Sequence, residues 1–155
     1  MMQSMPMPPM PYALLFACTM NAVRSPIAAA LMRHLGPELQ VDSVGVRAGG
    51  PDPLAAAALD EIGVAIGAHR PRRFEDLEEG SFDLIIALSR EARQKAMEWA
   101  GATRVEYWPT FDPTILEGSR EQRLAAYRMV RDQLLARLKA RFPAAAPPIA
   151  AARKG

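Results

Sequence analysis

The sequence predicts an α/β fold with three layers, a central four-stranded parallel sheet with helices on both of its faces. Three observations point to this class. Four short apolar segments, which are candidate strands, alternate with helical segments along the chain. The first of them is apolar at every position, as expected of a strand covered on both faces. The chain has 155 residues, half of them hydrophobic, and this length suits one domain with a single core.

The first strand and the first helix are predicted on either side of a short loop. Residues 12–17 form the apolar run of the strand. Ser25 and Pro26 are typical of a helix N-cap and a first helical residue, so a helix is expected over residues 26–35. Gly36 follows as a stop signal. The apolar stripe of this helix consists of Ile27, Ala30, Leu31 and Leu35.

The second strand and helix follow in the same order. Residues 41–46 predict the strand. Asp52 and Pro53 again combine a cap with a first helical residue, and Gly63 ends the helix. Its apolar positions recur at four-residue spacing, as in an amphipathic helix. These positions are Leu54, Ala58 and Ile62.

The second half of the chain completes the sheet. Residues 83–88 predict a third buried strand, and residues 90–99 predict a helix. Residues 104–108 predict the fourth strand, and a proline-containing loop follows at residues 109–118. The last helix is expected over residues 120–141. Its apolar face consists of Leu124, Tyr127, Val130, Leu134 and Leu138.

One domain is expected over residues 12–142, because the sequence has neither an internal repeat nor an evident boundary. Residues 1–11 are rich in Met and Pro and have no basic residue, so they predict a flexible lead and not a signal peptide. Residues 143–155 are rich in Ala and Pro and predict a disordered tail. No stretch approaches the roughly 20 apolar residues of a membrane span, so no membrane partner is expected.

The charge and the cysteine content exclude several classes of function. The formal net charge is only +2 and basic residues are interspersed with acidic ones, so nucleic acid is not expected as a partner. Cys18 is the only cysteine, which excludes an internal disulfide, a two-cysteine redox couple and a cysteine-rich zinc site. A free thiol with a functional role suits a reducing cytoplasm.

Cys18 lies in the loop between the first strand and the first helix, where it can act as a nucleophile. Ligands of parallel sheets bind at the carboxyl ends of strands, and helix N-termini direct N–H groups and a positive dipole at bound anions. Arg24 follows six positions later, and its planar guanidinium can hold two oxygens of a tetrahedral oxyanion. Both features favour a thiolate, which suits attack on phosphorus or arsenic. The alternative is an inert buried cysteine, the usual role of a free thiol.

Hydrolysis of a phosphate monoester also requires a proton for the leaving group, and a carboxylic acid near the loop can supply it. Asp112 is the best candidate, because it follows the fourth strand and should emerge at the same edge of the sheet. An Asp-Pro pair taken alone is more typical of a turn or a helix cap, and that alternative stays open.

Seven segments, taken in order, carry a family resemblance: residues 14–18, 21–28, 42–43, 51–53, 63–72, 82–88 and 112–113. Together they resemble the low-molecular-weight protein tyrosine phosphatases and the related thiol-dependent arsenate reductases, over roughly residues 12–141. The resemblance implies that Cys18 is a nucleophile that forms a phosphocysteine, that Arg24 binds phosphoryl oxygens, and that Asp112 is general acid and then general base. It also implies that no metal or organic cofactor takes part.

The same resemblance implies supporting roles around a phosphate loop. Asn21 would hold the loop in a strained, partly left-handed conformation, with Ser43 and His69 as its supports. A catalytic base is the alternative role for His69. Ser25 would stabilise the thiolate. The phosphate-binding residues would be Thr19, Met20, Asn21, Ala22, Val23, Arg24 and Ser25.

The chain departs from the family pattern at several positions. Met20 stands where the family usually has glycine, which predicts either an unfavourable backbone conformation or a reshaped loop. Val23 stands where the family phosphatases commonly have a second cysteine. The aromatic residues that usually frame a tyrosine ring are replaced by Gly49, Gly50, Thr114 and Ile115.

The leading prediction is a cysteine-dependent phosphatase that hydrolyses phosphate monoesters, protein phosphotyrosine among them, with inorganic phosphate or other oxyanions as product or inhibitor. An arsenate reductase is the first alternative, because residues 117–138 are closer to the endings of those enzymes; with one cysteine, it would need an external low-molecular-weight thiol. A non-catalytic module that binds oxyanions or phosphoproteins is the second, motivated by Met20. Finally, Arg70, Arg72 and Arg73 form a basic cluster, either a solvated loop or a surface that attracts a phosphorylated partner.

Overall fold

The predicted fold class is confirmed by the structure, a computed structural model that describes residue 11 and residues 13–67, 69–78, 81–101 and 103–143. Four parallel strands form one sheet in the order β2-β1-β3-β4. The strands are β1 (Ala13–Cys18), β2 (Gln40–Gly45), β3 (Leu84–Ala87) and β4 (Arg104–Tyr107). The helices are α1 (Arg24–Leu35), α2 (Pro53–Asp60), α3 (Arg90–Trp99) and α4 (Arg120–Arg141), with short 3₁₀ turns η1 (Phe74–Asp76) and η2 (Pro113–Ile115).

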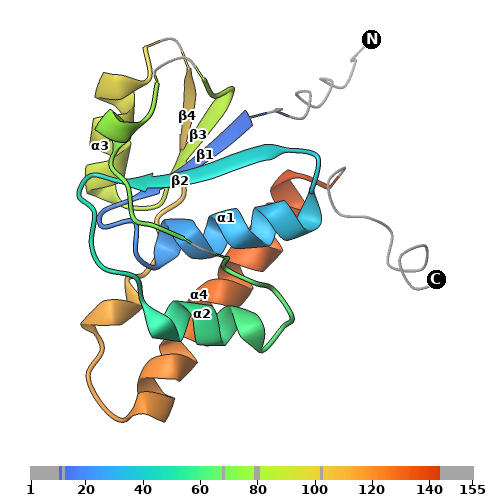
Figure 1. Cartoon of the computed structure of the whole chain (residues 1–155), viewed down its shortest axis with the longest axis vertical. Helices are drawn as coiled ribbons and strands as arrows, with labels where there is room; N and C mark the ends of the chain where they lie inside the picture. The colour runs from blue at the N-terminus through green and yellow to red at the C-terminus, as the bar shows by residue number, and fades with distance from the viewer. Residues whose placement is uncertain (1–10, 12, 68, 79–80, 102, 144–155) are drawn as a thin grey trace, which may run out of the picture.

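The two faces of the sheet are covered by different helices. Leu14 and Phe16 of β1 pack in one hydrophobic cluster with residues of α1, α2 and α4. Leu15 and Ala17 point to the other face, where they pack with α3 and with Phe74 of η1. Figure 1 shows this arrangement, with α3 on one side of the sheet and the other three helices on the opposite side. Every residue of β1 is buried, which explains why its sequence lacks polar alternation.

The start of α1 differs from the prediction. The helix begins at Arg24, its N-cap is Val23, and no side chain caps it. Ser25, expected as the N-cap, lies in the first turn and is fully buried. Its hydroxyl is already engaged, because it accepts a hydrogen bond from Asn21 and lies 3.0 Å from the sulfur of Cys18. The hydroxyl of Ser25, which the sequence pattern predicted as the cap of this helix, is therefore used in contacts with the loop that precedes the helix.

The other caps and stripes agree with the sequence, with one exception. Asp52 caps α2 by accepting a hydrogen bond from the main-chain N–H of Leu54, and Tyr127 donates to the same carboxylate at 2.7 Å. The five predicted stripe positions of α4 are all buried. Ile62 was expected on the apolar stripe of α2, but this helix ends at Asp60, so Ile62 lies in the following turn and is exposed.

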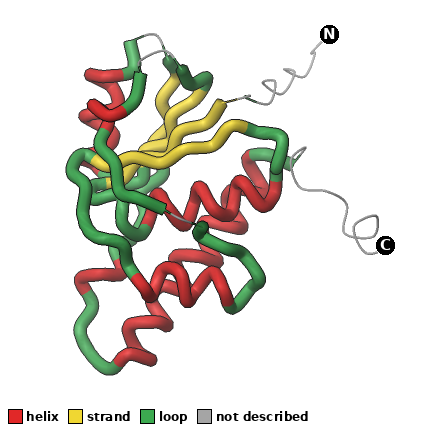
Figure 2. The backbone as a smooth tube through the Cα atoms, in the orientation of Figure 1, coloured by secondary structure: helices red, strands yellow, loops and turns green. Residues whose placement is uncertain are grey.

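The predictions for the chain ends remain untested. The expected lead, residues 1–11, and the expected tail, residues 143–155, lie outside the described residues except for Pro11 and Pro143. Among the helices that the structure describes, none is long and apolar enough to cross a membrane. Figure 2 shows the strands at the centre of the described chain, with the loops that follow β1 and β2 side by side at one end of the sheet.

Candidate active site

Cys18 is the last residue of β1, and residues 19–23 connect it to α1. Its side chain is only 2% exposed. The sulfur lies 3.0 Å from Ser25 Oγ and accepts a hydrogen bond from the main-chain N–H of Ser25 at 3.4 Å. The thiol thus sits against the first turn of a helix, where N–H groups and the helix dipole favour negative charge.

Asn21 is the centre of a buried hydrogen-bond network behind the loop. It has a φ of +53° and is the one non-glycine residue with positive φ in the part of the chain that the structure describes. Its Nδ2 donates to Ser25 Oγ and to Ser43 Oγ, each at 2.9 Å. Its Oδ1 accepts from the main-chain N–H of Arg72 at 2.7 Å. These bonds stabilise a left-handed conformation that most residues avoid, although asparagine tolerates it better than most.

His69 holds the main chain of the same residue. Its Nε2 lies 2.8 Å from the carbonyl oxygen of Asn21, and because a carbonyl only accepts, Nε2 carries the proton. Burial lowers the pKa of His69, the bond to this carbonyl opposes that effect, and the nearby Arg33 and Arg72 lower the pKa further. The imidazole is therefore neutral at neutral pH, with its N–H committed to the loop. This geometry suits a structural support more than a catalytic base.

The carbonyl groups of the loop point away from its centre. Those of Cys18, Thr19 and Met20 accept hydrogen bonds from N–H groups of residues 46, 47 and 49, at 2.8–3.1 Å. When a loop turns its carbonyls outward, its amide groups are free to face an anion at the centre. Gly45 makes this pairing possible, because a Cβ there would lie 2.7 Å from the nitrogen of Asn21.

Arg24 and Asp112 meet above the loop. Nη1 of Arg24 donates to the carbonyl oxygen of Thr110 at 3.1 Å, and Nη2 lies 3.8 Å from Oδ2 of Asp112. The other carboxylate oxygen of Asp112 accepts from the main-chain N–H and the hydroxyl of Thr114, at 3.0 and 2.7 Å. Asp112 therefore caps η2, as the turn interpretation predicted, and also faces the arginine of the loop.

A cavity of about 480 Å³ lies beside this pair. Phe111 forms part of its wall and is 47% exposed, so an aromatic ring flanks the site at a position that was not predicted from the sequence. The hydroxyl of Thr19, another wall residue, donates to Ser89 at 3.0 Å. Further wall residues are Leu88, Arg90, Glu91, Tyr107, Pro109 and Thr110.

The remaining loop positions have distinct environments. Met20 stands where the family usually has glycine, which made a backbone conformation unfavourable for methionine one of two expectations. The φ of Met20 is not positive, so this residue avoids that conformation. Its side chain is 40% exposed and lies beside Gly49. Ala22 is half-buried, and Val23 is buried in the cluster on the α1 side of the sheet. Among the described residues, no group of three His, Cys, Asp or Glu side chains could hold a metal ion.

Three contributors to the site were not predicted from the sequence: Gly45, Thr110 and the main chain of Arg72. Gly45 pairs with Cys18 in the register of β1 and β2, and Thr110 contributes only a carbonyl oxygen. Arg72 was noted for its charge, whereas its main-chain N–H holds Asn21. Main-chain donors and acceptors carry no signature in the sequence, so the sheet register was needed to find them.

Known proteins resemble this chain in sequence and in fold. The family model for low-molecular-weight phosphotyrosine protein phosphatase matches residues 13–142. The arsenate reductase of Bacillus licheniformis is 33% identical over 125 residues, which are 80% of this chain and 90% of the relative. A solved arsenate reductase in its reduced state is 26% identical with a TM-score of 0.69, covering 83% of this chain and 94% of that one. A YwlE arginine phosphatase mutant with a phosphorylated active-site serine is 27% identical with a TM-score of 0.67, covering 82% and 91%.

Proposed function

Because the chain belongs to the low-molecular-weight phosphotyrosine protein phosphatase family, we propose that it is a phosphatase that hydrolyses phosphate monoesters through a phosphocysteine intermediate. The observation that carries this proposal is the single thiol, Cys18, held against a helix N-terminus with Arg24 and Asp112 above it. Hydrolysis by this route needs one thiol, one acid and water, and the chain provides the first two. A reducing cytoplasm, which keeps a lone thiol free, is part of the proposal.

In the first step, the amides of the loop and the guanidinium of Arg24 bind the phosphoryl oxygens. The sulfur of Cys18 attacks phosphorus, and the bond from phosphorus to the leaving oxygen breaks. Asp112 transfers its proton to that oxygen, so the product leaves as an alcohol. Since Arg24 already contacts Asp112, both groups reach the same end of the loop.

In the second step, water attacks the phosphorus of the phosphocysteine. Asp112, now a carboxylate, accepts the proton of the water, and the thiolate of Cys18 leaves as inorganic phosphate forms. When Cys18 is a thiolate, which can only accept, the hydroxyl of Ser25, 3.0 Å from the sulfur, turns from the carbonyl oxygen of Val44 and donates a hydrogen bond to it. This bond stabilises the leaving group of the second step and the nucleophile of the next cycle.

Turnover of p-nitrophenyl phosphate tests the proposal. We expect the wild-type protein to release p-nitrophenol and the Cys18→Ser variant to release none above background. Mass spectrometry of Asp112→Asn mixed with substrate should reveal one added phosphoryl group on Cys18, because the second step is slowed. Wild-type protein that is no faster than Cys18→Ser overturns the proposal. If it still binds phosphate, the non-catalytic alternative replaces it.

Arsenate reduction is the second candidate, favoured by the names of the curated relatives, such as the enzyme of Bacillus licheniformis. Here the sulfur of Cys18 would bond to arsenic and displace water, and a second thiol would then attack this sulfur. The arsenic leaves as arsenite with the electron pair of the broken bond, and a disulfide forms. Because Cys18 is the only cysteine, that second thiol must come from another molecule.

An assay of thiol consumption separates the two candidates. Glutathione or another low-molecular-weight thiol is incubated with arsenate, and the protein is added. If the protein is an arsenate reductase, the thiol is oxidised only when both arsenate and Cys18 are present. A phosphatase shows phosphate ester turnover without any added thiol, and arsenate acts on it only as a competing oxyanion.

A further inference from the structure

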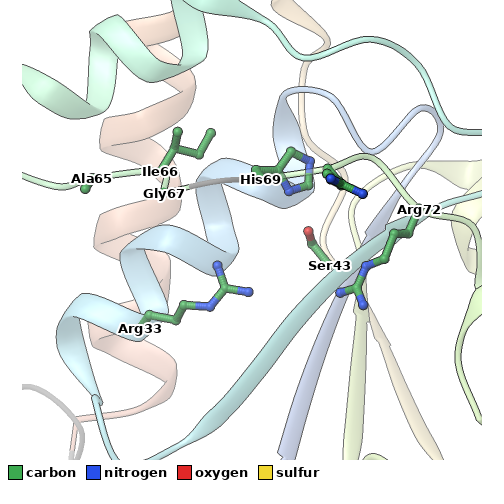
Figure 3. Close-up of a pocket in the computed structure, with 8 residues that line it drawn as sticks. Arg33, Ser43, Ala65, Ile66, Gly67, His69 and Arg72 are labelled. Carbon is green, nitrogen blue, oxygen red and sulfur yellow. The ribbon is translucent and has the colours of Figure 1, made fainter.

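A second cavity, of about 510 Å³, lies behind the catalytic loop, on the side away from Asp112. Arg33 of α1 and Ser43 of β2 form one part of its wall, and His69, Arg70 and Arg72 form another. Residues 65–67 complete it. In Figure 3 the guanidinium groups of Arg33 and Arg72 lie on either side of Ser43, with His69 above them.

Among the residues that the structure describes, the wall of this cavity has three arginines and no carboxylate. Asp42 lies outside the wall and is the neighbour of two of them, at 2.8 Å from Nη2 of Arg72 and 3.9 Å from Nη2 of Arg33. Arg70 has neither an ion pair nor a hydrogen bond among the described residues. One acidic group therefore neighbours two of the three cations, and the cavity keeps an excess of positive charge.

The titration of His69 reflects this excess. At Arg33, by contrast, burial lowers the pKa, and Asp42, which raises the pKa, acts more strongly than Arg72, which lowers it. The same two arginines add to the effect of burial on His69 and lower its pKa. A cation lowers the pKa of a neighbouring base because like charges repel each other. A bound anion would reduce this repulsion and would therefore be stabilised in the cavity.

The cavity also touches the supports of the catalytic loop. Ser43, His69 and Arg72 line it, and these three residues form hydrogen bonds with Asn21. A molecule bound there would contact the back of the loop while leaving Cys18 and Arg24 free. Its binding energy would add to the stability of the left-handed conformation of Asn21.

We propose that this cavity is a regulatory site for a small polyanionic phosphate compound, such as a molecule with a pyrophosphate group. Planar guanidinium groups match phosphate oxygens. Arg33 already donates from Nε and Nη2 to the carbonyl oxygen of Val41, and Arg72 donates from Nη2 to Asp42, so these two would bind an anion through their other N–H groups. Arg70, which has no such bond to a described residue, has its whole guanidinium available. The volume falls in the range of small-molecule sites, about 300–1,000 Å³, and suits a metabolite better than a protein segment. Occupancy stiffens the catalytic loop from behind, whichever oxyanion reaction the loop performs.

Pyrophosphate titration by calorimetry tests the site. The titration uses Arg24→Ala, which weakens oxyanion binding at the catalytic loop and makes the result independent of turnover. In this background we expect Arg70→Gln to weaken pyrophosphate binding by about tenfold, the usual cost of one charged hydrogen bond. Arg73→Gln is the matched control, because Arg73 carries the same charge but pairs with Asp76 and does not line the cavity. It should leave the affinity unchanged.

The imidazole signals in NMR spectra give a second readout, because the chain has only two histidines. Pyrophosphate should raise the pKa of His69, since an anion offsets Arg33 and Arg72, and should leave the signal of the exposed His34 in place. Equal affinities of Arg70→Gln and Arg73→Gln, or an unchanged His69, would overturn the proposal. A shift of His69 with a phosphopeptide but not with pyrophosphate would also overturn it and assign the surface to a protein partner.

Discussion

The back and the front of the catalytic loop are built differently. Behind the loop, the fully buried Asn21 forms four hydrogen bonds of 2.7–2.9 Å. In front of it, Arg24 and Asp112 are 3.8 Å apart, and the side chain of Asp112 is 34% exposed. The loop is thus fixed from behind by buried hydrogen bonds, whereas Asp112 is partly exposed and its carboxylate is held by Thr114 and faces Arg24 at a longer distance. Preorganised dipoles cost no rearrangement during the reaction, which is why such groups belong on the rigid side.

The front and the back of the loop also differ in their exposed apolar side chains. Phe111, Ile115 and Leu116, which flank Asp112 in sequence, are 43–66% exposed. Behind the loop, Asn21, Ser25 and Ser43 are buried polar residues, and each forms hydrogen bonds within the protein. If the proposed function holds, the back of the loop is the part that fixes the reacting groups, and the front is the part that contacts the substrate.

The largest expected effect on activity comes from a substitution at the front of the loop. Asp112→Asn should lower kcat/KM for phenyl phosphate by roughly 10²–10⁴ if Asp112 is the general acid. Asparagine can still cap η2, so stability should change little. The loss should be smaller for p-nitrophenyl phosphate, whose leaving group needs less protonation. Steady-state kinetics with both esters checks this prediction. Glu117→Gln, on the same loop, is the control, and an equal loss in that variant would contradict the role.

Behind the loop, Asn21→Ala should lower the free energy of unfolding by about 2–4 kcal/mol. It removes three side-chain hydrogen bonds and places an alanine at positive φ. Asn21→Gly separates these causes, because glycine tolerates this φ but also lacks the amide. Urea denaturation measures all three proteins. If Asn21→Ala is as stable as wild type, the back of the loop is not a rigid support.

A smaller effect is expected for Ser43→Ala. This change removes one of the two acceptors of Asn21 Nδ2, which still donates to Ser25, so the loss should be about 1 kcal/mol. Phosphate affinity of Cys18→Ser, with and without the Ser43 change, shows whether the loop keeps its shape. A loss as large as that of Asn21→Ala would mean that the network depends on Ser43 and not on Asn21.

The smallest effect concerns pH. Because the folded state lowers the pKa of His69, this residue contributes stability above its ordinary pKa, and that contribution is lost as pH falls through the lowered value. The free energy of unfolding of wild type should therefore decrease between pH 7.5 and 5.5 by more than that of His69→Gln, which keeps an N–H donor. Parallel pH profiles of the two proteins would show that His69 does not titrate in this way.

Sequence alone located most of the front and part of the back. Cys18 and Arg24 are six positions apart, at the two ends of one loop, and Asp112 follows the fourth strand. These positions were enough to predict that the three side chains lie at one edge of the sheet. The local cap signature of Ser25, by contrast, gave the wrong role, because its hydroxyl is used by residues of the loop. Arg33 offered no signal, since its approach to Arg72 depends on how α1 packs against β2.

The burial of Cys18 has a practical consequence. It is the only sulfhydryl in the chain and is 2% exposed, so a reagent that alkylates the protein once marks a single atom at the base of the loop. Labelling rates with electrophiles of increasing size would measure how wide the opening above that atom is. Protection from labelling by phosphate, arsenate or pyrophosphate would report which of these anions occupies the loop, without any assay of turnover.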